Sequence, residues 1–347
     1  MSYTLDVYCN DGSPLGITPP DIYTRGVGGA ELSLMTWAET MAKRGHTVTI
    51  YNNPLAPGVY DEVRYCPQGD FKPRDHRDVF IAYRSPNPYT RISNAEVRLF
   101  WSTDQYTVGN FATDIFPLVD RIVCISPFHV AYHKERYGVE NGKIGYFDLG
   151  VRQQDYSQEV EKIAGRCIFC SVPERGLSLL RMLWPRIKDK VPHASLVITS
   201  DYTLWGSPNP LNHQHRLDWM HQPDVHFHGK VDRLQLARLQ LEAECMPYSC
   251  VYDELFCISA AECQFAGAYP VTSPTGALKT TNQWGTVIKG NMMEADWQND
   301  FTDCVASMLN NPYDIRTTQM QHCAGERFNW ENICSRWELL IETGNFK

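Results

Sequence analysis

The chain has 347 residues, of which 43% are hydrophobic, and its formal net charge is −8. A chain of this length can bury a large core and exceeds the usual size of one domain, so we expect two domains. The negative charge provides no overall basic field, which argues against tight non-specific binding to nucleic acid or anionic membranes. The sequence has no apolar run near the roughly 20 residues that span a bilayer, and no signal-peptide pattern at its start. These features predict a cytoplasmic protein.

Strand and helix signals alternate along the first half of the chain, a pattern typical of a parallel sheet covered by helices. The run TLDVYC predicts a strand at 4–9, followed by an amphipathic helix over 29–45 and a strand at 47–51. Further strands are predicted at 78–83, 98–102 and 121–126, and a helix over 127–138.

The same pattern restarts after a polar stretch at 150–162. Strands are predicted at 166–171, 195–199, 225–229 and 244–248, with helices over 176–187 and 233–243. We therefore predict an α/β protein with two Rossmann-like, doubly wound parallel-sheet lobes that meet between residues 150 and 165.

A glycine-rich turn, RGVGGAE at 25–31, precedes the first predicted helix. A dinucleotide fingerprint would need glycine where Glu31 stands, and the second strand is followed by two asparagines rather than an acidic residue. This argues against a nicotinamide or flavin dehydrogenase. Gly28 and Gly29 would still let the backbone approach a ligand beside free helix N–H groups, although a tight turn without a ligand is the alternative.

The segment 253–274, DELFCISAAECQFAGAYPVTSP, places Glu254 before a predicted helix and Glu262 eight positions later. Ser259 and Glu262 fit a capping box, which is the structural alternative for Glu262. That alternative leaves Glu254 unexplained. Two carboxylates around an anion-binding helix start suit a nucleotide sugar, since one can accept hydrogen bonds from sugar hydroxyls and the other from a ribose. The backbone amides expected at this helix start are those of Phe256, Cys257 and Ile258.

This E-x7-E segment, followed by AGAYPVTSPTGAL, resembles the donor-binding segment of retaining glycosyltransferases of the GT-B fold, especially glycosyltransferase family 4. The resemblance extends in order over nearly the whole chain. It includes the segments 26–51, 122–138, 171–187, 225–231 and 328–342.

The resemblance implies an N-terminal, acceptor-side lobe at 1–155 and a nucleotide-sugar lobe at 156–328, with a donor cleft between them. It implies that a C-terminal helix at 329–347 crosses back to the first lobe. The implied reaction moves a sugar from a nucleotide-diphosphate sugar to an acceptor hydroxyl with retention of configuration, without a metal or another cofactor.

Site residues follow from the same resemblance. It implies catalytic roles for Glu254, Asp104 and Arg175, whose fork of donors suits a diphosphate; an exposed helix-start residue is the alternative for Arg175. The implied donor-binding residues are Gly28, Gly29, Ser171, Arg175, Lys230, Phe256, Cys257, Ile258 and Glu262.

Three positions depart from the family pattern. Ser171 stands where many relatives have a cation, which Lys230 or Lys279 would have to replace, and Thr103 stands in the place of a histidine before Asp104. The customary acidic residue after the second glycine turn is absent from TGALKTT.

No metal site is predicted. The sequence has no D-x-D motif, and most of its twelve cysteines lie in apolar runs, where cysteine behaves as a small hydrophobic residue. Cys167 and Cys170 have no second pair at zinc-finger spacing.

The expected partners are a UDP- or GDP-sugar and an acceptor that is a glycan, lipid, protein or modified nucleobase. Acceptor recognition is expected in the loops at 10–26 and 83–94. A sugar-nucleotide epimerase, a phosphorylase of the same fold and a non-catalytic nucleotide-sugar binding protein remain as alternatives.

Overall fold

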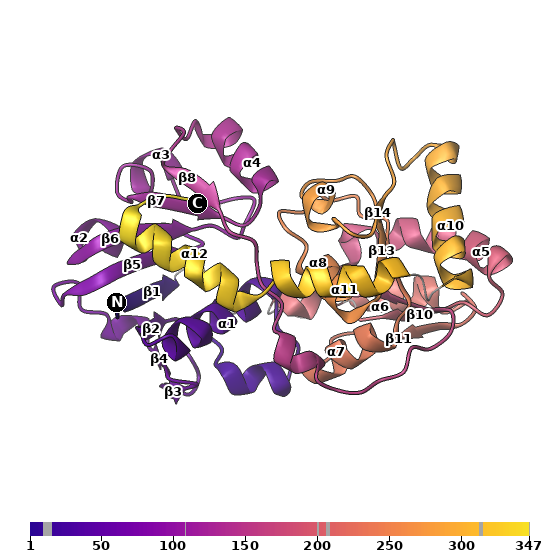
Figure 1. Ribbon diagram of the computed structural model, residues 1–347, viewed down its shortest axis with the longest axis horizontal. Helices are drawn as coiled ribbons and strands as arrows, with labels where there is room; N and C mark the ends of the chain where they lie inside the picture. The colour runs from indigo at the N-terminus through magenta and orange to yellow at the C-terminus, as the bar shows by residue number, and fades with distance from the viewer. Residues whose placement is uncertain (10–15, 108, 200, 206–208, 312–314, 347) are drawn as a thin grey trace. The chain divides into compact units, whose positions relative to one another are not determined.

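The computed structural model describes residues 1–9, 16–107, 109–199, 201–205, 209–311 and 315–346, and its chain divides into two compact units (Figure 1). Neither unit is one continuous segment. Unit 1 comprises Met1–Ile22, Gly28–Leu149 and Trp330–Lys347, and unit 2 comprises Tyr23–Val27 and Gly150–Asn329.

Unit 1 contains an eight-stranded sheet in the order β3-β4-β2-β1-β5-β6-β7-β8 within the described residues. All neighbouring strands are parallel except β3 and β4. The strands are β1 (Thr4–Cys9), β2 (Thr47–Tyr51), β3 (Gly58–Tyr60), β4 (Val63–Cys66), β5 (Arg77–Tyr83), β6 (Ala95–Trp101), β7 (Arg121–Cys124) and β8 (Ile144–Tyr146). The helices are η1 (Pro19–Tyr23), α1 (Gly29–Lys43), η2 (Gln68–Asp70), α2 (Tyr89–Ile92), α3 (Phe111–Asp114), α4 (Pro127–Tyr137) and α12 (Trp330–Thr343).

The core of unit 1 includes a tryptophan cluster that joins the C-terminal helix to the sheet. Trp37 of α1, Trp101 of β6 and Trp337 of α12 pack with ring centroids 4.9–5.4 Å apart. Helices α12 and α1 are in contact in this unit, and Figure 1 shows one end of α12 next to α1. At the end of α1, Arg44 Nη2 lies 2.5 Å from Glu338 Oε2 of α12, and His46 Nε2 lies 2.9 Å from Glu338 Oε1. Apolar packing and an ion-pair group therefore both hold α12 within unit 1.

Unit 2 contains a six-stranded parallel sheet in the order β11-β10-β9-β12-β13-β14 within the described residues. The strands are β9 (Arg166–Phe169), β10 (Ser195–Ile198), β11 (Val225–Phe227), β12 (Cys245–Tyr248), β13 (Tyr269–Thr272) and β14 (Thr286–Val287). The helices are η3 (Gln153–Tyr156), η4 (Pro173–Arg175), α5 (Leu177–Lys190), η5 (Tyr202–Trp205), α6 (Leu211–Trp219), α7 (Arg233–Glu242), α8 (Ile258–Ala266), α9 (Leu278–Thr281), α10 (Ala295–Asn310) and α11 (Ile315–Arg327).

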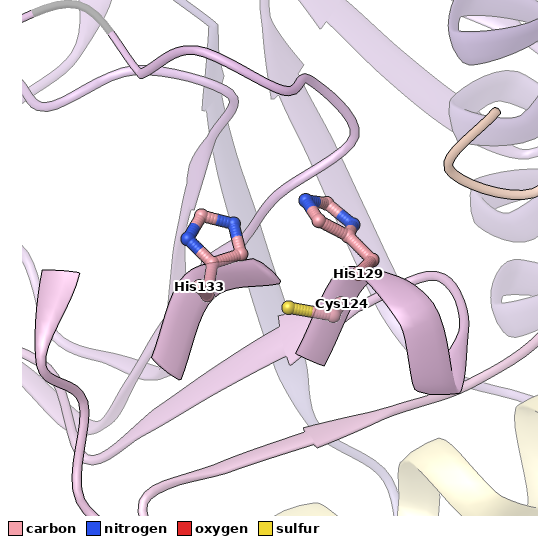
Figure 2. Close-up of side chains that lie close together, drawn as sticks. All are labelled: Cys124, His129 and His133. Atoms are coloured by element: carbon pink, nitrogen blue, oxygen red, sulfur yellow. The ribbon is translucent and has the colours of Figure 1, made fainter. Parts of the chain in front are cut away.

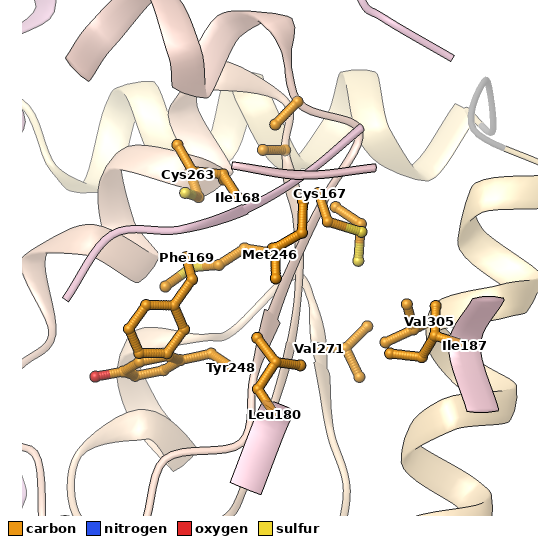
Figure 3. Packing of buried hydrophobic residues seen from close by; sticks show 14 of the residues in the cluster. Cys167, Ile168, Phe169, Leu180, Ile187, Met246, Tyr248, Cys263, Val271 and Val305 are labelled. Atoms are coloured by element: carbon orange, nitrogen blue, oxygen red, sulfur yellow. The ribbon is translucent and has the colours of Figure 1, made fainter. Parts of the chain in front are cut away.

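The core of unit 2 lies between the sheet and its helices (Figure 3). Phe169 and Tyr248 pack against each other from neighbouring strands, with ring centroids 5.6 Å apart. Cys167, Cys245 and Cys263 lie in the same core and are fully buried. In the described residues, which include all twelve cysteines, there is no disulfide. Ten of the twelve cysteines are buried, as expected of small hydrophobic residues.

The predicted fold class, an α/β protein with two parallel-sheet lobes, is also confirmed. Each strand predicted from the sequence overlaps an observed strand. The sequence reasoning missed β3, β4, β8 and β14, which have two to four residues each and lie at or near the edges of the two sheets. Among the described residues, no helix combines the length and apolar character that a membrane span needs.

Candidate functional site

In unit 2, the loops that follow β9 and β12 bring a carboxylate, a guanidinium and two hydroxyls together. Glu254 is 3% exposed, and its carboxylate accepts a 2.6 Å hydrogen bond from the Tyr248 hydroxyl. Arg175 Nη1 lies 2.9 and 3.1 Å from the two oxygens of the same carboxylate. Ser171 Oγ lies 3.0 Å from the Tyr248 oxygen. We call Ser171, Arg175, Tyr248 and Glu254 the carboxylate cluster. It lies at the carboxyl end of a parallel sheet, where α/β proteins generally bind ligands.

The charges of the carboxylate cluster stabilise one another. Burial, reinforced by the negative charge of Glu254, raises the pKa of Tyr248 far above its ordinary value, so this side chain remains a hydroxyl donor. Burial, the largest single influence, lowers the pKa of Arg175, but the surrounding groups, with the Glu254 carboxylate first among them, together raise it above its ordinary value. The Arg175 guanidinium also lies 4.8 Å from the ring centroid of Tyr252. The cluster therefore presents a charged, oriented guanidinium beside a fixed carboxylate.

Two glycines fix the backbone around this cluster. Gly176 has φ +126°, and a Cβ there would lie 2.2 Å from the Ser249 carbonyl oxygen. Gly276, in the loop after β13, has φ +52°, and a Cβ there would lie 2.3 Å from the Glu254 carbonyl oxygen. The next amide, Ala277 N–H, donates to that oxygen at 2.7 Å. Only glycine allows these close backbone approaches, which hold Arg175 and Glu254 in place.

Helix α8 begins beside Glu254. The capping-box alternative expected Ser259 at its N-cap and Glu262 in its first turn, and the structure differs from this. Its N-cap is Cys257, which has φ +70° and makes no side-chain cap hydrogen bond. Ser259 Oγ donates to the Cys170 carbonyl at 2.6 Å, and Glu262 is paired elsewhere. The capping-box interpretation is therefore wrong, because both side chains have partners outside the helix. The first N–H groups of α8, beginning at Ile258, still lack intrahelical acceptors, as at any helix start. The Phe256 side chain is 2% exposed and packs edge-on against Phe328.

Glu262 belongs to a second, buried network that the sequence reasoning did not identify. Arg233 Nη1 lies 2.6 Å from Glu262 Oε1, and Gln240 donates to Glu262 Oε2 at 3.1 Å. Arg233 also pairs with Asp155 at 2.6 Å and donates to the Tyr156 hydroxyl at 2.9 Å. Arg233 and Glu262 are 4% and 2% exposed. The predicted contact between Glu262 and a ribose stays a prediction, and a ribose hydroxyl would have to reach a buried carboxylate that is already ion-paired with Arg233.

Lys230 lies after β11 at the same end of the unit 2 sheet and is partly buried. Its loop packs against the glycine-rich turn: a Cβ at Gly26 would lie 2.5 Å from the Val231 carbonyl oxygen and 2.7 Å from Lys230 Cγ. The first glycine of the turn is therefore needed for close packing within unit 2. Lys279, the other candidate to replace a missing cation, is exposed in α9.

In unit 1, Gly28 and Asp104 lie in one polar group, which centres on a residue that the sequence reasoning missed. Arg84 Nη1 lies 3.1 Å from Glu31 Oε1, and Nη2 lies 2.9 Å from Asp104 Oδ1. A Cβ at Gly28 would lie 2.2 Å from Glu31 Oε2, so the glycine makes room for this carboxylate at the start of α1. Gly29 is the first residue of that helix.

Arg84 has φ +66° and directly follows β5, while Asp104 follows β6. Burial would lower the pKa of Arg84, but Asp104 and Glu31 outweigh it and raise the pKa. The Asp104 side chain is 35% exposed and can meet a ligand. Arg84 could have been predicted as a site residue from the sequence, because it directly follows a strand that was predicted to be buried. Of the predicted acceptor loops, residues 10–15 lie outside the described residues. The donor cleft expected between the two lobes stays a prediction.

No family model matches the sequence, and no curated protein matches it. Solved structures do match its fold over nearly the whole chain. A sucrose-phosphate synthase from Thermosynechococcus elongatus is 14% identical, with a TM-score of 0.69, and the match covers 98% of each chain. HepE from Anabaena, in complex with UDP-glucose, is 13% identical, with a TM-score of 0.68 and coverage of 98% of this chain and 100% of that one.

The catalytic domain of starch synthase IV from Arabidopsis thaliana, bound to ADP and acarbose, is 9% identical, with a TM-score of 0.66 and coverage of 99% of each chain. At these identities the likeness concerns the fold alone. Together with the two parallel sheets, it establishes that the chain has the two-lobed α/β fold of GT-B glycosyltransferases.

Proposed function

We propose that this chain is a retaining glycosyltransferase, resembling family 4, that moves a sugar from a nucleotide-diphosphate sugar to an acceptor hydroxyl. The observation that carries the proposal is the carboxylate cluster. Glu254 is held by Tyr248 and Arg175 beside the first turn of α8, at the carboxyl end of the unit 2 sheet. A guanidinium and a helix start attract a diphosphate, and a neighbouring carboxylate accepts hydrogen bonds from sugar hydroxyls.

Each group in the cluster has a separate task in the proposed reaction. Arg175 and the N–H groups at the start of α8 stabilise the negative charge that develops on the departing diphosphate. Glu254 orients the sugar through its hydroxyls. Tyr248 keeps the carboxylate in place, because its raised pKa leaves the hydroxyl protonated. For the retention of configuration we rely on analogy with family 4, in which the leaving phosphate takes the acceptor proton on the same face.

We further propose a UDP-sugar as the donor and a reaction that needs no metal. HepE was solved with UDP-glucose, and starch synthase IV with ADP. The absence of a D-x-D motif, together with Arg175 and the α8 start, favours neutralisation of the diphosphate by protein groups. In unit 1, Gly28, Gly29 and Asp104 are the proposed contacts for the transferred sugar or acceptor.

A nucleotide screen tests the proposal. Thermal unfolding is measured with UDP, GDP, ADP and their sugars, because a ligand that binds only the folded chain stabilises it by about 2.7 kcal/mol at 100 times its Kd. UDP and UDP-sugars are expected to raise the Tm. Arg175→Ala should remove most of this shift. Arg238→Ala is the matched control, since the Arg238 side chain is 63% exposed on α7 and pairs with its helix neighbour Glu242.

The other functions give different results in the same preparation. An epimerase converts the sugar nucleotide without an acceptor, and a phosphorylase releases a sugar phosphate only when inorganic phosphate is present. A non-catalytic binding protein shows the thermal shift, but it forms no product with any acceptor class. If none of the nucleotides or sugar nucleotides shifts the Tm, the proposal is contradicted.

A further inference from the structure

Unit 1 contains a buried group of thiol and imidazole side chains that takes no part in the proposed reaction. Cys124 is the last residue of β7, and His129 and His133 lie on α4 (Figure 2). All three are 0% exposed. One ligand atom from each side chain lies within 4.8 Å of the ligand atoms of the other two.

The local sequence explains why these side chains meet. Ser126 is the N-cap of α4, and its side chain accepts a 3.0 Å hydrogen bond from His129 N–H. The N-cap therefore lies two residues after Cys124, and the helix starts at Pro127. Positions four apart share one face of a helix, so His129 and His133 both turn toward the end of β7. Figure 2 shows the two rings side by side with the Cys124 sulfur next to them.

A fourth polar group lies at coordination spacing. Ser102 Oγ, just after β6, is 2.9 Å from His133 Nε2 and 3.4 Å from His129 Nε2. In a tetrahedral zinc site, with bonds of about 2.0 Å to nitrogen and 2.3 Å to sulfur, neighbouring ligand atoms are about 3.3–3.6 Å apart. The 3.4 Å distance from Ser102 Oγ to His129 Nε2 falls in this range, whereas the 2.9 Å distance to His133 Nε2 is that of a hydrogen bond and would lengthen on binding. The separations of up to 4.8 Å within the trio need side-chain shifts of about 1 Å.

We propose that Cys124, His129 and His133 bind one Zn²⁺ ion, with the Ser102 hydroxyl at the fourth position. Imidazole nitrogen and thiolate sulfur are ligands that Zn²⁺ prefers, and four protein ligands are typical of structural rather than catalytic zinc. Binding replaces the Cys124 S–H bond by an S–Zn bond and releases the proton to solvent. Zn²⁺ undergoes no redox change.

The role of this site is to hold the loop that carries Asp104. His129 Nε2 lies 3.2 Å from the Asp104 carbonyl oxygen, and Ser102 is two residues before Asp104. An ion bound by Ser102, by Cys124 of β7 and by the two histidines of α4 would link the loop after β6 to these two elements and restrict its movement. The Asp104 side chain meanwhile pairs with Arg84. Because the site is fully buried, the ion enters as the chain folds and leaves only when unit 1 opens.

The alternative to a bound ion is a purely hydrogen-bonded network of the same side chains. Among the described residues, His133 Nδ1 is buried and has no hydrogen-bond partner, and it does not distinguish the two arrangements, because Nε2 is the ring nitrogen that contacts Ser102. The rival arrangement is a network in which Ser102 bridges the two rings and Ile125 N–H contacts His129 Nδ1 at 3.4 Å.

Metal analysis of the purified full chain separates these possibilities. The protein is expressed with added zinc, freed of loosely bound metal and analysed by mass spectrometry, and the expected content is about one zinc per chain. Cys124→Ser and His133→Gln should each retain at least about tenfold less metal. Cys334→Ser controls for loss of a buried thiol elsewhere in unit 1. His76→Gln controls for the exposed group His76, Asp78 and Glu96.

A second measurement keeps the proposal testable if a ligand variant fails to fold. Wild-type protein is unfolded with a chelator and refolded with Co²⁺, which should give a thiolate-to-cobalt charge-transfer band and the visible bands of a tetrahedral site. Refolding with Zn²⁺ should raise the Tm above that of the chelated sample, and Mg²⁺ should not. The proposal is overturned by wild-type protein without zinc or a cobalt band, or by ligand variants that keep the wild-type metal content.

Discussion

Glu254 and Glu262 are eight residues apart, but the structure gives them different surroundings. Glu254 lies between a tyrosine hydroxyl and a guanidinium that is 30% exposed. Glu262 pairs with Arg233, and both side chains are 3% exposed. The E-x7-E spacing could be read from the sequence, whereas the partners of Glu262 could not, because Arg233 and Gln240 come from another element, α7. The capping-box interpretation failed for the same reason.

Substitution of each glutamate should therefore affect a different quantity. Glu254→Gln keeps the shape of the side chain but removes the charge that orients Arg175 and the sugar, so we expect kcat to fall about 100-fold with a small change in Tm. Steady-state kinetics with the donor identified by the nucleotide screen measure the effect. Unchanged kcat in a folded Glu254→Gln variant would contradict the role proposed for this carboxylate.

Glu262→Gln removes one partner of a buried ion pair and leaves Arg233 with less compensation. We expect a loss of about 3 kcal/mol of stability together with weaker nucleotide binding. Thermal unfolding and ligand titration separate the two effects. Wild-type stability would show that the Arg233 network contributes little. Lost stability with unchanged nucleotide affinity would contradict the predicted ribose contact.

Gly176 provides a test of how strictly the loop before α5 is specified. Alanine there would combine a φ of +126° with a contact of 2.2 Å to the Ser249 carbonyl oxygen, so Gly176→Ala should cost more than about 2 kcal/mol. Chemical denaturation measures the loss. Gly138→Ala separates conformation from contact, since Gly138 has φ +65° and nothing lies within 4 Å of its Cβ position. An equal loss of stability in both variants would show that the close contact with the Ser249 carbonyl oxygen adds no destabilisation beyond that of the positive φ.

At the scale of elements, the strands that the sequence predicted best are those with long buried runs. All but one residue of β5 is buried, and its run of apolar residues predicted a strand without ambiguity. The edge strands β3 and β14 have three and two residues, and their pairing comes from neighbouring strands rather than from their own composition. Arg84 was missed although β5 was predicted, because its role depends on Glu31 and Asp104 from other elements.

Helix α12 gives a prediction about acid stability. The Arg44 and His46 hydrogen bonds to Glu338 lower the pKa of this carboxyl below its ordinary value. A lowered folded-state pKa means that the stabilisation is complete above the ordinary glutamate pKa of about 4.3 and is lost as the pH falls through the folded-state value. Glu338→Gln should cost about 1 kcal/mol at pH 7, and the difference from wild type should shrink below about pH 4.

Urea denaturation of the two proteins from pH 7 to pH 3.5 measures this difference. Glu342→Gln, at an exposed position on the same helix, serves as the control. A stability difference that does not change with pH would show that the ionisation of Glu338 plays no part.

At the scale of the whole molecule, the two alternating β/α halves were sufficient to predict two parallel-sheet lobes. The sequence did not predict which short segments belong to each unit. Tyr23–Val27 belongs to unit 2 although it lies within the first 30 residues, and Gly26 explains this through its close packing on Lys230 and Val231. The composition and the hydrophobic periodicity of the sequence do not indicate that this segment packs in unit 2.

The response to chelators distinguishes two possible uses of metal. If the protein groups neutralise the diphosphate, transfer should survive brief treatment with excess EDTA, because the proposed zinc is buried and unit 1 remains closed. Loss of activity that Mg²⁺ or Mn²⁺ restores would contradict metal-independent transfer. Loss of activity that is restored only by refolding with Zn²⁺ would not contradict metal-independent transfer. It would show instead that the proposed zinc site of unit 1 is needed for the active structure.

The tryptophan cluster has a consequence for how the protein is made. Trp37 and Trp101 emerge early from the ribosome, but Trp337, which covers them, is synthesised after all of Gly150–Asn329. Most of unit 2 can therefore complete its fold while unit 1 still exposes a broad aromatic surface. During this interval the nascent chain is most open to aggregation and to chaperone binding. Slow translation at any point between the emergence of Trp101 and the synthesis of Trp337 would prolong that exposure.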